Sequence, residues 1–414
     1  MNRTIKIASL IAAATLAAGP VRAADQGAGM PGEWLTQYAS ARTLGLGNAY
    51  VATANDPFGI LWNPAGLSGM EQNELHFETA RLFDDTAIHG LGFAVPGSWL
   101  PSFGLTILTL RSGEFEKTNE LNDALGTFSE GETAYLFTVS RAFSPRLAVG
   151  ANLKVIQQTV EEFSAGGFGA DLGATYEVIP GLKIGASIAN LGGPNLKLRD
   201  TEEPWPTAIR GGAALQVLGG RGLIALQVDQ SDGLGARFHG GGEYKIQNAF
   251  ALRAGFDQTR ATGGLSYQFA PQYTIDYGVA DHPLGMTHRL GMSWKFGGFF
   301  ASSSADPQVF SPTGEHAVTR ISLNSRTKSE PESWTVEILS KSDEVVRRFG
   351  GKGQPPSHLQ WDGKDETGLP LPDGVYRFNL VVRDQSARVL ESHTRTIEIS
   401  TTGPQGTVPV VETP

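Results

Sequence analysis

The sequence predicts an all-β protein: an antiparallel transmembrane β-barrel of about 14 strands with an N-terminal hatch, followed by a small C-terminal β-sandwich. Three observations predict this class. Strand-length segments between residues 73 and 296 alternate apolar and polar side chains with a period of two. After residue 23 no apolar run approaches the roughly 20 residues that a membrane helix needs. The two longest connections, 113–132 and 192–206, fall on the same side of the expected barrel, as is usual in outer-membrane barrels.

Composition and motifs limit the possible functions. The 414 residues include no cysteine, which excludes disulfides and cysteine-ligated metals. The formal net charge of −9 argues against a nucleic-acid partner. The sequence has no G-x-S-x-G or H-E-x-x-H motif and no dense cluster among its 8 histidines. We therefore expect no enzyme activity, no cofactor and no metal site.

Residues 1–23 read as a secretory signal peptide. Arg3 and Lys6 supply the positive start, residues 7–18 form a short apolar core, and small residues precede a cleavage site after Ala23. The mature chain is therefore expected to be exported, and its strand pattern places it in the bacterial outer membrane.

Residues 24–72 precede the strand pattern and contain a motif rich in small residues. Arg42-x-Leu-Gly45-Leu-Gly47 could be mistaken for a nucleotide loop, but no strand precedes it and no third glycine completes that fingerprint. Together with a later Asn-Asp-Pro and Asn63-Pro64-Ala65-Gly66-Leu, it resembles the N-terminal hatch of FadL-like outer-membrane barrels, especially their PorV/PorQ-type branch. The resemblance implies a hatch or gate built by Arg42, Gly45, Gly47, Asn63, Pro64, Ala65 and Gly66.

Fourteen strands are expected between residues 73 and 296. The two longest loops, 113–132 and 192–206, both fall on the outer side if the N-terminus is periplasmic. The expected strands are 73–83, 86–96, 103–112, 133–143, 146–158, 167–178, 181–191, 207–217, 222–230, 236–246, 249–258, 261–269, 273–281 and 286–296.

The last expected strand carries a specific signal. Arg289-x-Gly291-x-x-Trp294-x-Phe296 resembles the end of the final strand in bacterial outer-membrane barrels. The resemblance implies recognition by the barrel-insertion machinery, with the two aromatic residues in the girdle at the surface of the lipid bilayer.

Charged residues fall on the inward face of several expected strands. They could line a solute path, or they could pair with each other and with the hatch to fill the lumen. We favour pairing, because polar lumens are general in this class. The residues are Lys154, Arg210, Asp229, Arg253, Asp257, Asp276, Arg289 and Lys295.

The remaining chain is expected to form a linker (297–310), a periplasmic domain (311–400) and a disordered tail (401–414). Trp361-Asp362-Gly363-Lys364-Asp365, with a later Asp-Gly-Val-Tyr, resembles the Ig-like domain of the flagellar hook-capping protein FlgD. The two aspartates could suggest calcium, but they lack the spacing of a calcium loop. We favour an ordinary turn.

Two function classes remain open. The FadL-like hatch implies passage of a hydrophobic small molecule, which apolar residues of the first long loop could capture. The PorV/PorQ-type resemblance implies a non-transport scaffold or secretion accessory (type IX-like) that binds secreted or periplasmic proteins. The loop is strongly charged, which suits capture poorly. The intact Asn63-Pro64-Ala65 favours transport, which we rank slightly ahead of the scaffold. The capture candidates are Phe115, Leu121, Leu125 and Phe128.

Overall fold

The computed structural model describes residues 30–401, apart from residues 38, 84, 99, 247–248, 314–316 and 386–387. The expected signal peptide at 1–23 lies outside the described residues, as does the expected tail at 401–414 apart from its first residue. None of the helices in the described ranges is both long and apolar enough to cross a membrane.

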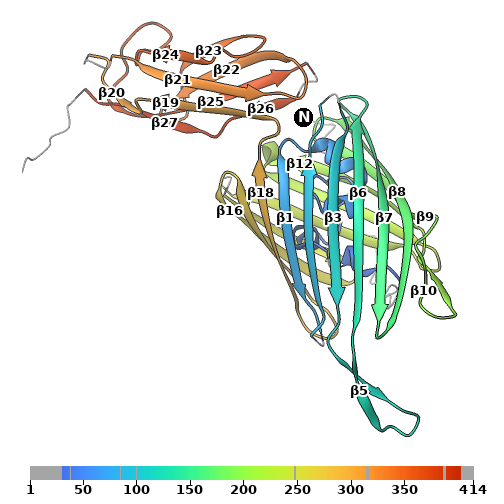
Figure 1. Cartoon of the computed structure of the whole chain (residues 1–414). Coiled ribbons are helices and arrows are strands. Elements are labelled where there is room, and N and C mark those ends of the chain that lie inside the picture. Colours follow the sequence, from blue (N-terminus) through green and yellow to red (C-terminus); the bar gives the residue numbers. More distant parts are fainter. Residues whose placement is uncertain are drawn as a thin grey trace, which may run out of the picture.

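Fourteen antiparallel strands form a closed barrel, which confirms the predicted fold class (Figure 1). Neighbouring strands pair in chain order, and the last strand closes on the first with Asn73 opposite Phe296. The barrel strands are β1 (Asn73–Arg81), β2 (Ala87–Val95), β3 (Ser102–Arg111), β6 (Glu130–Ala142), β7 (Leu147–Val160), β8 (Phe163–Ile179), β9 (Leu182–Leu191), β12 (Ala208–Val217), β13 (Gly222–Ser231), β14 (Arg237–Ile246), β15 (Phe250–Asp257), β16 (Arg260–Ala270), β17 (Tyr273–Ala280) and β18 (Thr287–Phe296).

The two faces of the wall differ as the alternation predicts. In β18 the side chains of Arg289 and Ser293 are buried inside, whereas Leu290 and Met292 are 48% and 44% exposed outside. Exposed apolar side chains on strand after strand match a lipid-facing wall. At the end of the barrel where β18 finishes, neighbouring aromatic rings form an outer row with centroids 4.5–6.4 Å apart. The row comprises Phe250, Tyr267, Phe269, Tyr273, Trp294 and Phe296.

A charge placed on the outer wall tests this assignment. Leu153→Arg, in the middle of β7, is expected to destabilise the barrel by about 2–4 kcal/mol in lipid vesicles, because the bilayer core solvates arginine poorly. Leu147→Arg, at the end of the same strand, should cost only about 0–1 kcal/mol. Urea unfolding of both variants in vesicles measures the difference. Equal costs would contradict a lipid-facing wall.

The two ends of the barrel carry different structures. At one end, the hairpin end, β4 (Phe115–Thr118) and β5 (Ala124–Phe128) form a separate two-stranded sheet within the first long loop. The hairpin projects beyond the barrel (Figure 1). The second long loop, at the same end, contains β10 (Asn195–Lys197) and β11 (Glu202–Pro204). The C-terminal domain lies at the opposite end, the domain end (Figure 1).

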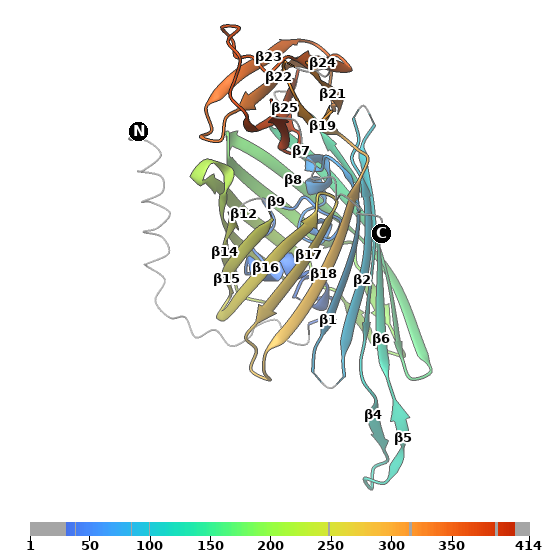
Figure 2. The ribbon, with the colours of Figure 1, turned by 90° about the vertical axis from the view of Figure 1, so that its left-hand side faces the viewer.

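The hatch occupies the inside of the barrel (Figure 2). It contains α2 (Trp34–Gln37), α3 (Ala41–Gly45) and two 3₁₀ helices, η1 (Gly59–Leu61) and η2 (Pro64–Gly69). Since the inner wall is largely polar, the apolar core of the barrel lies mainly in the hatch. Its largest fully buried side chains include Tyr50, Phe58, Trp62 and Leu67.

The C-terminal domain is a two-sheet β-sandwich. One sheet has the order β19-β21-β24 and the other β20-β27-β25-β22-β23, with β26 paired to β25. Trp361 is fully buried between the sheets and packs edge-on against Tyr376. The strands are β19 (Phe300–Asp306), β20 (Val309–Phe310), β21 (Thr319–Arg326), β22 (Pro331–Leu339), β23 (Val345–Lys352), β24 (His358–Trp361), β25 (Gly374–Asp384), β26 (Val389–Glu391) and β27 (Arg395–Ile399).

The segment expected as a linker, 297–310, is mostly part of this sandwich, so that expectation is corrected. Its β19 pairs with β21 along its whole length, and β20 pairs with β27. The buried positions of β19 include Ser303 and Ala305, which are small and give little apolar signal. Only residues 297–299 connect the barrel to the domain.

Candidate functional site

Asn63 fixes the hatch motif in place. Its Oδ1 accepts a hydrogen bond from the N–H of Ala65 at 3.0 Å and so caps η2. Its Nδ2 donates to the carbonyls of Val51 at 2.8 Å and Ala174 at 3.0 Å. Ala174 belongs to β8, so one side chain ties the 3₁₀ helix, a second hatch segment and the barrel wall together. The side chain is fully buried, which makes each lost bond costly.

Arg42 organises the other half of the hatch. Its guanidinium donates to Asn55 at 3.0 Å and pairs with Asp56 at 3.4 Å. The Asp56 carboxylate also accepts from the Tyr50 hydroxyl and from the N–H groups of Phe58 and of Gly59, which opens η1. The predicted hatch residue Arg42 therefore braces a turn within the hatch.

The wall approaches the hatch through glycines. A Cβ on Gly173 would lie 2.1 Å from Asn63 Oδ1, and one on Gly150 would lie 2.4 Å from the carbonyl carbon of Pro64. On the hatch side, a Cβ on Gly47 would lie 2.3 Å from the carbonyl oxygen of Phe256. Real Cβ atoms do not approach other atoms this closely. Glycine is required at these positions because atoms of the hatch and the backbone of the wall are in direct contact.

Every barrel strand contacts the hatch. Four strands, β2, β14, β16 and β17, do so through Gly92, Gly241, Gly264 and Gly278, which lie against Pro57, Leu46, Gly45 and Ala41. The other ten strands form hydrogen bonds with it, and β14 also does so through Arg237, which donates to Glu33 at 2.8 Å. The residues of these ten strands that bond to the hatch are, in chain order, Glu78, Thr106, Ser140, Asn152, Ala174 through its carbonyl, Ser187, Arg210, Gln227, Asp257 and Arg289.

The inward charges pair with each other, as we expected. Arg253 is typical: it pairs with Glu243 at 2.7 Å and with Asp276 at 3.1 Å, and all three are buried. The other pairs are Lys154–Asp171 at 3.0 Å, Arg210–Asp229 at 3.4 Å, His239–Asp257 at 2.8 Å and Lys295–Glu74 at 3.8 Å. These charges pair within the lumen, and Arg253, Asp276 and Lys295 also line a cavity of about 400 Å³.

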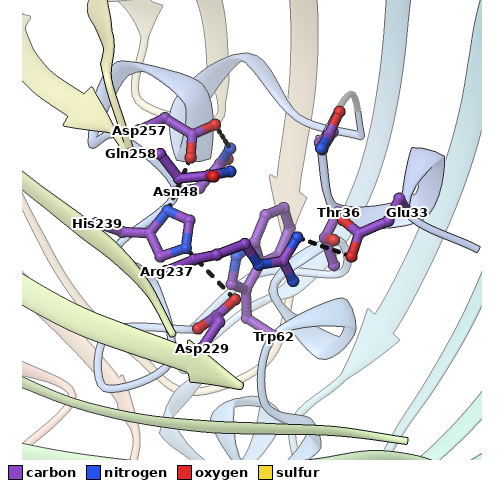
Figure 3. Close-up of a pocket in the computed structure, with 10 residues that line it drawn as sticks. Glu33, Thr36, Asn48, Trp62, Asp229, Arg237, His239, Asp257 and Gln258 are labelled. Carbon is purple, nitrogen blue, oxygen red and sulfur yellow. Dashed lines mark hydrogen bonds and ion pairs between the residues drawn. The ribbon is translucent and has the colours of Figure 1, made fainter. Parts of the chain in front are cut away.

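A first cavity adjoins the hatch toward the hairpin end (Figure 3). Its volume of about 10 Å³ is near the minimum for a single water molecule. His239 lies between Asp257, at 2.8 Å, and Asp229, at 3.6 Å, and Arg237 pairs with Glu33 of the hatch at 2.8 Å. Paired polar groups line this cavity, and its volume is too small for an apolar ligand.

A second cavity, of about 400 Å³, lies toward the domain end. Charged groups from the hatch and from five strands line it, including Arg42, Arg253 and Lys295. His393 of the C-terminal domain also lines it. Such a lining holds water or polar solutes and suits a hydrophobic compound poorly.

Two histidines buried in the lumen, His76 and His239, were not singled out from the sequence. His76 of β1 lies between Glu74, at 3.3 Å, and Glu78, at 3.1 Å. These three residues alternate along one expected strand, so the period-two pattern alone could have placed them together. His239 and its two aspartates come from three strands, and no local pattern connects them.

The predicted capture residues line neither of the two cavities described above. Leu121 is 82% exposed near the tip of the projecting hairpin, and Leu125 is 58% exposed. The rings of Phe115 and Phe128 pack together with centroids 5.6 Å apart. The four residues share one hairpin.

The two remaining predicted features are the turn at Asp365 and the signal in the last strand, and both make contacts within the protein. Asp365 accepts from the N–H groups of Thr367 and Leu369, as in an ordinary turn. In the described part of the chain no cluster of three or more acidic or histidine side chains could hold a metal ion. Gly291 of the last-strand signal faces the Glu78 carboxylate, and Arg289 donates to the Ser40 carbonyl at 3.5 Å. Recognition of this signal by insertion machinery stays a prediction.

Comparisons with known proteins describe the two domains separately. A family model described as the FlgD Ig-like domain matches residues 311–386. No curated protein matches this chain.

The chain is also similar to solved structures. The Pseudomonas putida toluene transporter TodX is 12% identical with a TM-score of 0.47, over 62% of this chain and 96% of that chain. A Pseudomonas aeruginosa FadL homologue is 13% identical with a TM-score of 0.44, over 62% and 98%. At these values the function of this chain has to be argued from its own residues.

Proposed function

We propose that this protein is an outer-membrane barrel whose hatch stays seated and which anchors its C-terminal Ig-like domain instead of conducting a solute. The observation that carries the proposal is the contact of the hatch with all fourteen strands, eleven of them through hydrogen bonds. The hatch is a plug in this proposal, and the ranking that Asn63-Pro64-Ala65 suggested from sequence is reversed.

Energetics support a permanent plug. A buried hydrogen bond contributes about 1 kcal/mol net. Breaking ten of them would cost on the order of 10 kcal/mol before any apolar core is exposed, so spontaneous opening would be very rare. A ligand would have to repay that cost through its own binding, and the 10 Å³ cavity at the hairpin end offers it no site.

The orientation follows from the two ends. Long loops of such barrels face outward and short turns face the periplasm. The projecting β4–β5 hairpin would then be extracellular and the Ig-like domain periplasmic. An Ig-like domain held there is suited to binding periplasmic or secreted proteins, in line with the scaffold alternative from the sequence.

Passage of a hydrophobic molecule through the wall is the second candidate, and one observation favours it. The pairing of β8 with β9 shifts register between Ala170 and Leu172, close to the hatch. However, the residue at this shift is Asp171, which is buried. It pairs with Lys154 and accepts the N–H of Asn190 at 2.9 Å. These polar groups oppose passage of an apolar molecule unless they move.

A disulfide between hatch and wall tests the proposal. A Cβ on Gly104 would lie 3.8 Å from Leu67 Cγ, so Leu67→Cys with Gly104→Cys is placed for a bridge, and the chain has no other cysteine. We expect ion conductance and uptake of a fluorescent fatty acid into proteoliposomes to stay at the level of empty liposomes in both the oxidised and the reduced protein. Leu67→Cys alone is the control. Uptake that appears only on reduction would show a moving hatch and favour transport.

A further inference from the structure

The C-terminal domain touches the hatch itself, at the end of η2. Lys328 Nζ donates to the carbonyl oxygen of Ser68 at 2.9 Å, and the Arg388 guanidinium donates to the same oxygen at 3.2 Å. The two cations come from different loops, one between β21 and β22 and one between β25 and β26. Carbonyls in the last turn of a helix have no partner within it, so this oxygen is free to accept both.

Ser68 connects three parts of the molecule. Its N–H donates to Ser140 Oγ of β6 at 3.2 Å, and its own hydroxyl donates to the Ala65 carbonyl at 2.9 Å. The residue is buried. A displacement of the Ser68 carbonyl would therefore also disturb its residue's hydrogen bonds to the wall and to the Asn63-Pro64-Ala65 turn.

A buried carboxylate positions the two cations. Asp384, 1% exposed, accepts the N–H of Arg388 at 3.0 Å and the N–H of Ser329, next to Lys328, at 3.4 Å. The cation-bearing loops are thus braced from within the domain. Burial, with Arg388 nearby, lowers the pKa of Lys328 to about 8, as expected for an amine withdrawn from water.

The connection between barrel and domain is also fixed. Gly297 and Gly298 have φ of +56° and +74°, and a Cβ on Gly298 would lie 2.4 Å from the Glu71 carbonyl oxygen. The next residue, Phe299, is buried, donates its N–H to that carbonyl and lies under Lys328, whose Nζ is 6.0 Å from the ring centroid. The turn therefore holds the start of the domain against residues 71–72, which connect the hatch to β1.

We propose that the Ig-like domain is a clamp that keeps the hatch seated through Lys328 and Arg388 on the Ser68 carbonyl. This inference rests on the proposed function, because it explains how a plug stays closed. It also assigns the domain a role within the chain, in addition to any partner that it binds. His393 at the rim of the larger cavity places the domain over the same end of the lumen.

The test is the reactivity of a single cysteine in the hatch. Leu67→Cys replaces a fully buried side chain that faces the wall at Gly104 and not the domain, so simply uncovering the hatch would not expose it. In detergent-solubilised full-length protein, Lys328→Ala with Arg388→Ala should raise the maleimide labelling rate about tenfold or more, because two charge-assisted hydrogen bonds are lost.

Matched variants control for charge and folding. Lys341→Ala with Arg348→Ala removes one lysine and one arginine from exposed positions of the same domain and should leave the rate unchanged. Lys328→Arg with Arg388→Lys keeps both cations and should stay near wild type. An unchanged rate in the alanine pair would overturn the clamp. The proposed function is judged separately: free ion conductance by the wild type would overturn it, whatever the labelling ratio.

Discussion

Gly173→Ala is expected to loosen the hatch where the Asn63-Pro64-Ala65 motif meets β8, to destabilise the barrel and to raise its ion conductance. The added Cβ would lie 2.1 Å from Asn63 Oδ1 and 2.8 Å from Pro64 Cδ, so the motif has to move away from β8. Overpacking of this kind costs about 1–3 kcal/mol. The bonds of Asn63 to Ala65, Val51 and Ala174 would be strained or lost, at about 1 kcal/mol each. We expect a total loss of about 3–5 kcal/mol.

Conductance in planar bilayers and thermal unfolding measure this effect. Gly211→Ala on β12 is the matched control, because a Cβ there meets open space. It should neither conduct nor lower the unfolding temperature. If Gly173→Ala behaves like this control, then the hatch is not held in direct contact with the wall, and the sealed-barrel proposal loses its main support.

The strands and their faces could be predicted because alternation is a local signal. Each strand of the wall has one face toward lipid and one toward the lumen. The adjacent residues Arg289 and Leu290 can therefore be assigned to opposite faces from the local sequence alone. The predicted pairing of inward charges followed from the same logic. The β4–β5 hairpin and β19 were missed, since charged or small residues such as Glu116 and Ser303 give no apolar periodicity.

The partners of the hatch could not be predicted from the sequence. Gln227 accepts the N–H groups of Tyr50 and Val51, which lie more than 170 positions earlier in the chain. Such pairs depend on how the hatch is rotated inside the barrel, and no local pattern encodes that rotation. The motif identified Asn63 as important, but the same rigid turn serves a gate and a plug. The contact of the hatch with every strand favours the plug.

Asp171→Leu is expected to destabilise the wall strongly. Lys154, 4% exposed, would lose its ion pair and retain Asn190 Oδ1 at 2.7 Å and a cation–π contact with the Trp205 ring, 5.9 Å from the ring centroid. Removing one partner of a buried pair typically costs about 3–5 kcal/mol, because the other charge stays uncompensated. Lys154→Met with Asp171→Leu should recover much of this loss, since replacing both partners with apolar groups is often nearly neutral. Urea unfolding of the single and double variants gives the coupling energy.

The same variants separate the two candidate functions, because Asp171 lies at the register shift between β8 and β9. Lys154→Met with Asp171→Leu makes that part of the wall apolar while the hatch keeps its other contacts. If the protein is a plugged anchor, fatty-acid uptake should stay at background in the double variant, since no ligand site leads to the wall. If the shift is a blocked exit for hydrophobic molecules, removing its polar groups should raise uptake without raising ion conductance. That outcome would restore transport as the better assignment, with Asp171 and Lys154 as its gate.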